Sequence, residues 1–363
     1  MTSFVPRRIF PHLDSLPRSY FLGHHRAGLN KMKTMLTYID LVIECRDYRV
    51  PLTSRNPLFE ENLAGRERLI VYTKHDLGSE GKQEDKNVCS WKPQVYVIQS
   101  TLTNKLLQRE RVIQEHLRPT AVLFSDHKDK SSVRKVLNFS RHHATAKDSL
   151  TGSRMMVVGM PNVGKSSLLN ALRRVGVHKG KVAFTGAQPG VTRKIGTTVK
   201  IIEGSEKSEG VYLMDTPGVF IPYVPNAESM LKLALCGSVK DTIIAPTTLA
   251  DYLLYQMNLY DPAVYKEYAA PTNEVTDFLG AVAHKTGRLQ KGGIPDEEAA
   301  ALWVIQRWRN GHFGLFVLDE VTPAGMETAL RDIQGLGSSL NQARRTDKDV
   351  RRQRSKQQYL DSG

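Results

Sequence analysis

Residues 159–166, GMPNVGKS, combine glycines, a lysine and a serine at the spacing of a loop that binds phosphate groups. An apolar run precedes them, and residues 167–172 have the composition of a helix. Backbone N–H groups and the start of that helix would hold the phosphates. Lys165 is expected to reach the terminal phosphates, and the Ser166 hydroxyl to bind Mg²⁺. The predicted nucleotide contacts in this loop are Asn162, Val163, Gly164, Lys165, Ser166 and Ser167.

A second group, Asp215-Thr216-Pro217-Gly218, ends another apolar run later in the chain. An aspartate at this place can hold Mg²⁺ through water, and the N–H of Gly218 can meet the terminal phosphate. The glycine-rich stretch between the two groups contains Thr192, the candidate for a Mg²⁺ ligand that is released on hydrolysis, with Thr185 as the alternative. The predicted metal ligands are therefore Ser166, Thr192 and Asp215.

Residues 73–76, Thr-Lys-His-Asp, have the pattern of a box that recognises guanine. A carboxylate accepts hydrogen bonds from both the N1–H and the 2-amino group of guanine, whereas adenine cannot supply both. Asp76 is therefore expected to select guanine, and Lys74 to pack its stem over the base. Thr73 stands where an asparagine is usual. Ser100, which follows the apolar run at 95–98, is predicted to touch the base as well.

The order of these groups is unusual, because the guanine box precedes the phosphate loop and an ordinary GTPase has the opposite order. The chain is therefore predicted to be circularly permuted, and the strand that ends at Asp215 leads directly into the next domain. The residue after Gly218 is Val219, where signalling GTPases have a glutamine that orients the attacking water. Valine cannot do this, so hydrolysis must use another polar group, a partner or a metal ion.

Short apolar runs lead into the loops, and stretches of helical composition separate them. These runs, expected to be strands, are residues 41–45, 69–72, 95–98, 155–158 and 211–214. Such an alternation is typical of a parallel sheet covered on both faces, with ligands at the carboxyl ends of its strands. The predicted fold class is α/β: a P-loop domain with a doubly wound, mostly parallel sheet, then a smaller all-helical domain and a basic tail.

Apolar residues recur at helical spacing after Pro225, and a helix is expected to begin near Asp296. From Ser338 this periodicity ends and basic residues dominate. The first 20 residues contain arginines and serines with one acid, as in a mitochondrial presequence; a disordered basic start is the alternative. The predicted divisions are a presequence at 1–20, the permuted GTPase domain at 21–224, a helical RNA- or ribosome-binding domain at 225–335, and the tail at 336–363.

The amino-acid composition indicates which classes of partner the protein could bind. The chain has 363 residues and a formal net charge of +14, and a basic excess of this size favours RNA or anionic lipid as a partner. No apolar run approaches the roughly 20 residues that a transmembrane helix needs. The three cysteines are far apart in the sequence and have no metal-ligand spacing, which argues against disulfides and structural zinc.

Several further motifs resemble the YlqF/RbgA family of circularly permuted GTPases, and within it the mitochondrial members. Residues 47–57, DYRVPLTSRNP, are similar to the family's D-A-R-x-P-x-S-x-R-N-P signature, with Tyr48 in place of alanine. Gly23-His24-His25 is similar to the start of its P-G-H-M segment, with Leu22 in place of proline. Two later stretches resemble the C-terminal domain of the family, residues 287–293 and 308–314.

The resemblance implies a GTPase that binds GTP, GDP and Mg²⁺ and assists assembly of the mitochondrial large ribosomal subunit, with hydrolysis stimulated by that particle. It implies His24 as the catalytic residue that replaces the missing glutamine, and a K⁺ ion beside the phosphates near Asn162. It places the protein in the mitochondrial matrix, with peripheral contact to the inner membrane as a further expectation, and as a monomer when free. A nucleotide-gated RNA-binding module and a translation factor that acts on mature ribosomes are the alternatives.

Overall fold

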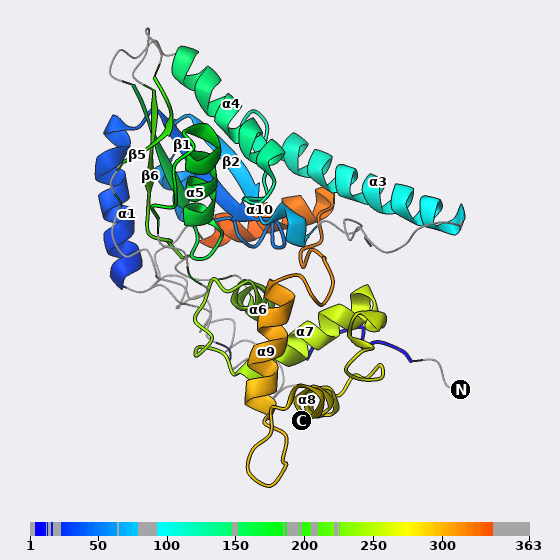
Figure 1. Ribbon diagram of the computed structural model, residues 1–363. Coiled ribbons are helices and arrows are strands. Elements are labelled where there is room, and N and C mark those ends of the chain that lie inside the picture. The colour runs from blue at the N-terminus through cyan, green and yellow to red at the C-terminus, as the bar shows by residue number, and fades with distance from the viewer. Residues whose placement is uncertain are drawn as a thin grey trace, which may run out of the picture.

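The computed structural model describes residues 4–11, 13, 16, 23–63, 65–78, 93–146, 152–183, 186, 196, 198–204, 210–220, 224 and 226–336. In Figure 1 a sheet with its covering helices forms the upper part of the molecule, and a group of helices formed by later residues lies beneath it. The nucleotide-binding motifs belong to the upper part.

The sheet has six strands in the order β3-β2-β1-β4-β6-β5. They are β1 (Leu41–Asp47), β2 (Arg68–Thr73), β3 (Ala121–Phe124), β4 (Ser153–Gly159), β5 (Val199–Ile202) and β6 (Val211–Asp215). All neighbouring strands are parallel except β5, which is antiparallel to β6. Every residue of the central strand β1 is buried, including the charged Glu44, Arg46 and Asp47 toward its end, which are held in ion pairs. The predicted α/β class with a mostly parallel sheet is confirmed.

Helices cover both faces of this sheet. They are α1 (Gly23–Met35), α2 (Pro57–Asn62), α3 (Pro93–His116), α4 (Lys130–Ala146) and α5 (Lys165–Gly176). Apolar residues of α4 and α5 pack with Ile43 and Val157 on one face. Residues of α1 and α2 pack with Val42 and Met156 on the other face. Because side chains alternate along a strand, neighbouring residues of β1 and β4 serve the two layers.

The predicted strand at 95–98 is wrong, because these residues lie in α3. Valine and isoleucine in this run favour a strand, but no glycine or proline interrupts the chain from residue 94 to residue 116, and the longer run forms a helix. The strand beside β2 is instead β3, which has only four residues and is followed by Ser125. The edge strand β5 was not predicted either.

The later helices are α6 (Ala227–Leu235), α7 (Pro246–Tyr260), α8 (Val275–Thr286), α9 (Glu297–Arg309) and α10 (Pro323–Leu336). Short 3₁₀ helices lie at η1 (Leu36–Tyr38), η2 (His75–Leu77) and η3 (Pro262–Tyr265). Asp296 caps α9 by accepting a hydrogen bond from the N–H of Ala299 at 2.9 Å, where a helix start was expected. Helices α7, α8 and α9 pack together, whereas α10 packs against α2 and α3 (Figure 1). The predicted boundary at residue 335 stays a prediction.

The segment before the first helix contacts α7. The Arg7 guanidinium pairs with the Asp251 carboxylate at 2.5 Å, and the Phe10 ring meets the Tyr252 ring edge-on, with centroids 5.2 Å apart. A presequence at 1–20 stays a prediction. Among the described residues, no helix combines the length and apolar character needed to cross a membrane.

Candidate nucleotide site

The predicted motifs meet at one edge of the sheet, where parallel strands end. β1 ends at Asp47, β2 at Thr73, β4 at Gly159 and β6 at Asp215. β1 and β4 are neighbours at the centre of the sheet, and the chain leaves them toward opposite sides, to β2 on one side and to β5 and β6 on the other. Such a point in an open α/β sheet is where ligands bind.

The phosphate loop connects β4 to α5, and its backbone requires glycine at two places. A Cβ at Gly159 would lie 2.4 Å from the carbonyl oxygen of Cys45, and Gly164 has a φ of +97°. The Nζ of Lys165 donates to the carbonyl oxygen of Met160 at 2.7 Å. Burial lowers the pKa of Lys165, and the nearby Asp215 carboxylate opposes that change. The Lys165 amino group thus lies inside the loop, where phosphates would bind.

Ser166 and Asp215, two of the predicted metal ligands, are in contact. The Ser166 hydroxyl donates to Oδ2 of Asp215 at 2.6 Å, while Oδ1 of Asp215 is buried with no hydrogen-bond partner among the described residues. Burial raises the pKa of Asp215. Mg²⁺ prefers oxygen ligands, so a hydroxyl beside a carboxylate with an unsatisfied oxygen fits this ion. Thr192 and Thr185 lie outside the described residues.

The guanine box follows β2. Thr73 donates a hydrogen bond from its hydroxyl to the carbonyl oxygen of Val163, so it braces the phosphate loop. Lys74 has a φ of +55°, and its Nζ donates to Oδ2 of Asp47 at 2.8 Å and to the carbonyl of Asn162 at 2.6 Å. Burial lowers the pKa of Lys74, and the Asp47 charge opposes the change. Asp76 lies in η2 and is partly exposed, as a residue that meets a base must be.

Ser125 occupies the place that the sequence interpretation gave to Ser100. Ser100 lies in α3, and its side chain is outside the described residues. Ser125 directly follows β3, and its carbonyl accepts a hydrogen bond from the N–H of His75 at 3.4 Å. Its buried hydroxyl has no partner among the described residues. The strand end on which the assignment of Ser100 rested is therefore absent, and Ser125 becomes the candidate at this position.

Two further residues beside the guanine box, Lys128 and Asp47, were not predicted as site residues from the sequence. The Nζ of Lys128 lies 3.4 Å from Oδ2 of Asp76. The apolar run at 121–124, followed by Ser-Asp-His-Lys, is a signal that could have revealed both Ser125 and Lys128. For the contact between Asp47 and Lys74 the sequence offers no comparable signal, since 27 residues separate them.

The Asp76 carboxylate should decide which nucleotide binds. Asp76→Asn exchanges an acceptor for a donor, so affinity for GDP should fall by about 10²-fold through loss of charge-assisted hydrogen bonds, while affinity for xanthosine diphosphate should rise. Fluorescence titration with both nucleotides measures the change. Asp129→Asn, an exposed change at the start of α4, is the matched control and should leave both affinities as they are. Equal affinity of the unaltered protein for ATP and GTP would refute the role of Asp76.

Gly218 passes very close to the phosphate loop, because a Cβ there would lie 2.5 Å from Cα of Pro161. The N–H of Val219 donates to the carbonyl of Gly159 at 3.2 Å. Helix α1 lies against the same segment, since a Cβ at Gly28 would be 3.7 Å from Cβ of Pro217. His24 is in the first turn of α1, although its side chain is outside the described residues. The helix that bears His24 thus packs beside the segment that follows Asp215.

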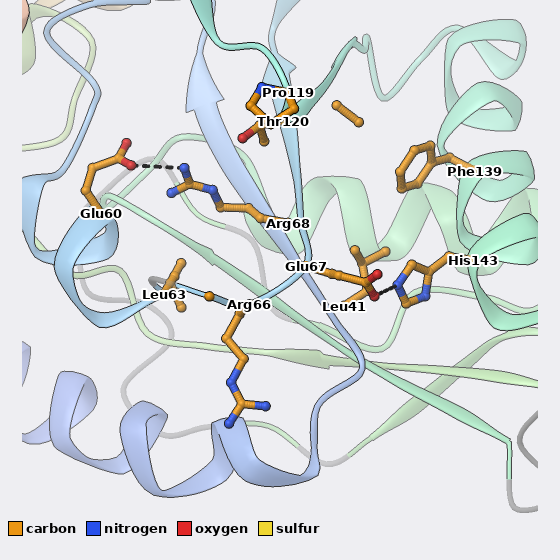
Figure 2. Close-up of a pocket in the computed structure, with 12 residues that line it drawn as sticks. Leu41, Glu60, Leu63, Arg66, Glu67, Arg68, Pro119, Thr120, Phe139 and His143 are labelled. Carbon is orange, nitrogen blue, oxygen red and sulfur yellow. Dashed lines mark hydrogen bonds and ion pairs between the residues drawn. The ribbon is translucent and has the colours of Figure 1, made fainter. Parts of the chain in front are cut away.

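A cavity of about 490 Å³ lies at the other end of the strands, where β1, β2 and β3 begin. Figure 2 shows Glu60 paired with Arg68 and Glu67 paired with His143 at its wall. Because these charged groups pair with one another and the nucleotide motifs are at the opposite edge, the candidate site is not this cavity.

The chain is similar to known proteins over most of its length. The family described as "50S ribosome-binding GTPase" matches residues 154–281. "Mitochondrial GTPase 1" of Schizosaccharomyces japonicus is 36% identical over 307 residues, which cover 84% of this chain and 90% of that protein. "Mitochondrial ribosome-associated GTPase 1" of Bos taurus is 34% identical, with coverage of 86% and 92%. The crystal structure of GNP-bound YlqF from T. maritima has the same fold, with a TM-score of 0.51 at 20% identity over 80% of this chain and 97% of that chain.

Proposed function

The chain belongs to the family of mitochondrial ribosome-associated GTPases, and from that membership we propose that it hydrolyses GTP during assembly of the mitochondrial large ribosomal subunit. It is a GTPase with the fold of YlqF. The observation that carries the proposal is the meeting of the phosphate loop, Asp215 and the guanine box at the ends of neighbouring strands. The names of the relatives support the ribosomal partner and the mitochondrial location.

Different residues of the site bind different parts of the nucleotide. Lys165 and the loop N–H groups hold the phosphates, and the N–H of Gly218 meets the terminal phosphate. Asp76 and Ser125 hold the guanine. Ser166 and Asp215 would hold Mg²⁺, which when bound neutralises charge on the transferred phosphoryl group. Lys165 must leave the carbonyl of Met160 to reach the nucleotide.

No glutamine follows Gly218, so the attacking water needs another partner. His24 is proposed for this role, because α1 packs against Pro217 next to Gly218. Binding of the ribosomal particle would press this helix toward the terminal phosphate and so stimulate hydrolysis. The K⁺ ion implied for Asn162 stays a prediction, and the Asn162 amide here donates to the carbonyl of Gly237 at 2.8 Å.

Sedimentation of mitochondrial ribosomes after depletion of the protein tests the proposal. Loss of assembled large subunits, with small subunits retained, is the expected result. Normal subunits combined with poor translation would favour a translation factor. GTP turnover with and without purified large subunits separates an assembly GTPase from an RNA-binding module whose own hydrolysis is irrelevant.

The basic tail at 336–363, nearly all of which lies outside the described residues, is proposed to bind ribosomal RNA. Removing residues 340–363 should weaken binding to large subunits and reduce the slope of log affinity against log salt, because fewer counterions are released. Binding measured between about 50 and 200 mM salt gives that slope. A tail of the same length with its arginines replaced by glutamine separates charge from length. If the truncated protein keeps both affinity and slope, the tail does not contact RNA.

A further inference from the structure

The loop between β1 and α2, residues 48–56, touches both the nucleotide site and the later helices. We propose that this β1–α2 loop couples the state of the nucleotide to helices α6 and α9. Asn56, at the end of the loop, contacts the nucleotide site, and Thr53 in its middle and Arg49 near its start contact the helical part. The inference rests on the assignment of the nucleotide to the site above and adds how that site controls the helical part.

Asn56 connects the loop to the segment that senses the terminal phosphate. Its Nδ2 donates to the carbonyl oxygen of Val219 at 2.8 Å, and its Oδ1 accepts from the N–H of Leu58 at 3.0 Å, which caps α2. The residue is fully buried. Val219 follows Gly218, whose N–H is the proposed contact of the terminal phosphate. Movement of this segment on hydrolysis must therefore stretch or break a buried hydrogen bond to the loop.

The middle of the loop is fixed to the chain between α9 and α10. The Asp319 carboxylate accepts from the Thr53 hydroxyl at 2.6 Å and from the N–H groups of Thr53 and Leu52 at 2.8 and 2.9 Å. The N–H of Leu318 donates to the carbonyl of Arg49 at 2.8 Å. Lys232 of α6 lies 3.4 Å from the same carboxylate. The loop cannot shift without moving residues 318 and 319.

The start of the loop joins the guanine box to α9. Arg49 makes a bidentate pair with Asp47, with Nε–Oδ1 at 3.0 Å and Nη2–Oδ2 at 2.8 Å, and Lys74 shares that carboxylate. Although burial opposes it, the two cations hold the pKa of Asp47 well below its usual range. The Arg49 guanidinium lies over the Trp308 ring, 4.9 Å from its centroid. A planar, always charged group can serve both contacts, which a lysine could not.

Two routes thus lead from Val219 to the helical part: the chain itself, which continues to α6, and the β1–α2 loop. The loop is short, largely buried and hydrogen-bonded along its length, so it transmits a displacement rather than absorbing it. By linkage, helices that favour one position of the loop must also favour one nucleotide state.

Hydrogen exchange of the full-length protein tests the proposal. With GDP and with a non-hydrolysable GTP analogue, the unaltered protein should show different exchange at residues 314–322 and in the last turn of α9. Asn56→Ser keeps an oxygen that can cap α2 but is too short to reach Val219. This variant should bind both nucleotides within about 3-fold of the unaltered protein and lose the nucleotide-dependent difference. Its GTP-to-GDP affinity ratio should change by the coupling factor, about 3-fold.

Asn226→Ser is the matched control, because Asn226 also caps a helix, by accepting from the N–H of Ser229 at 2.7 Å, and its side chain makes no hydrogen bond to Val219 among the described residues. The Asn226→Ser variant should keep the nucleotide-dependent difference in hydrogen exchange. A difference retained in Asn56→Ser, or absent from the unaltered protein, overturns the coupling role of the loop. Failure of the unaltered protein to bind GTP would instead refute the nucleotide site, so the two failures are distinguishable.

Discussion

Lys165→Ala should lower affinity for GTP by about 10²- to 10³-fold, because it removes charge-assisted hydrogen bonds to the terminal phosphates in a water-poor loop. The lysine is only 6% exposed, so solvent screens its charge weakly. The truncation also leaves Asp215 without its neighbouring cation, which adds to the repulsion of phosphate. Titration with fluorescent GTP and GDP at fixed Mg²⁺ measures the loss, and GTP should suffer more than GDP because it has the additional phosphate.

Lys179→Ala is the control for general loss of positive charge, since Lys179 is an exposed lysine just beyond α5. Its affinities should equal those of the unaltered protein. GTP binding within about 3-fold in Lys165→Ala would show that the phosphates are held elsewhere, because loss of even one such hydrogen bond should exceed that factor.

His24→Ala should reduce hydrolysis stimulated by the large subunit by ~10²-fold or more, the size expected for a positioned catalytic group. Val219 offers the attacking water no polar side chain, whereas α1, the helix that contains His24, packs through Gly28 against Pro217. Affinity for GTP and for the particle should be retained, since neither depends on this imidazole. Single-turnover hydrolysis with and without large subunits separates chemistry from binding.

His25→Ala is the matched control, because it removes the adjacent imidazole from the same helical turn. It should have a much smaller effect, as neighbouring positions on a helix point in different directions. Unchanged stimulated turnover in His24→Ala would contradict this role and would show that the catalytic group is part of the ribosome or is a metal ion.

The phosphate loop, the guanine box and most of the sheet could be predicted from the sequence, because their chemistry is encoded in local spacing. Gly159 and Gly164 lie where the backbone requires glycine, and Ser166, after β4, meets Asp215, at the end of β6, as their positions predict. The apolar residues at helical spacing after Pro225, among them Phe278 of α8, and the start of a helix near Asp296 could be predicted for the same reason, because both depend on residues a few positions apart.

Contacts between distant parts of the chain could not be derived in this way. The strand β3 has only four residues, and the β-branched residues in α3 resemble a strand more closely, so local sequence favours Ser100 although Ser125 follows the strand. The signature at 47–57 marks a family, but its spacing does not reveal that Asp47 meets Lys74 or that Asn56 meets Val219. Such pairs depend on tertiary packing, which overrides local propensity.

The order of the strands has a consequence for how the protein is made. Strands β1, β2 and β3 come from the first part of the chain and β4, β5 and β6 from the second, so the pairing of β1 with β4 is the seam between two consecutively synthesised half-sheets. The half that carries the guanine box leaves the translating ribosome before the half that carries the phosphate loop exists. At the proposed site a nucleotide would touch both halves, and its binding would then stabilise their pairing by mass action. In this topology a bound nucleotide would hold the two halves together. Guanine nucleotide should therefore promote association of the two halves when they are produced as separate fragments.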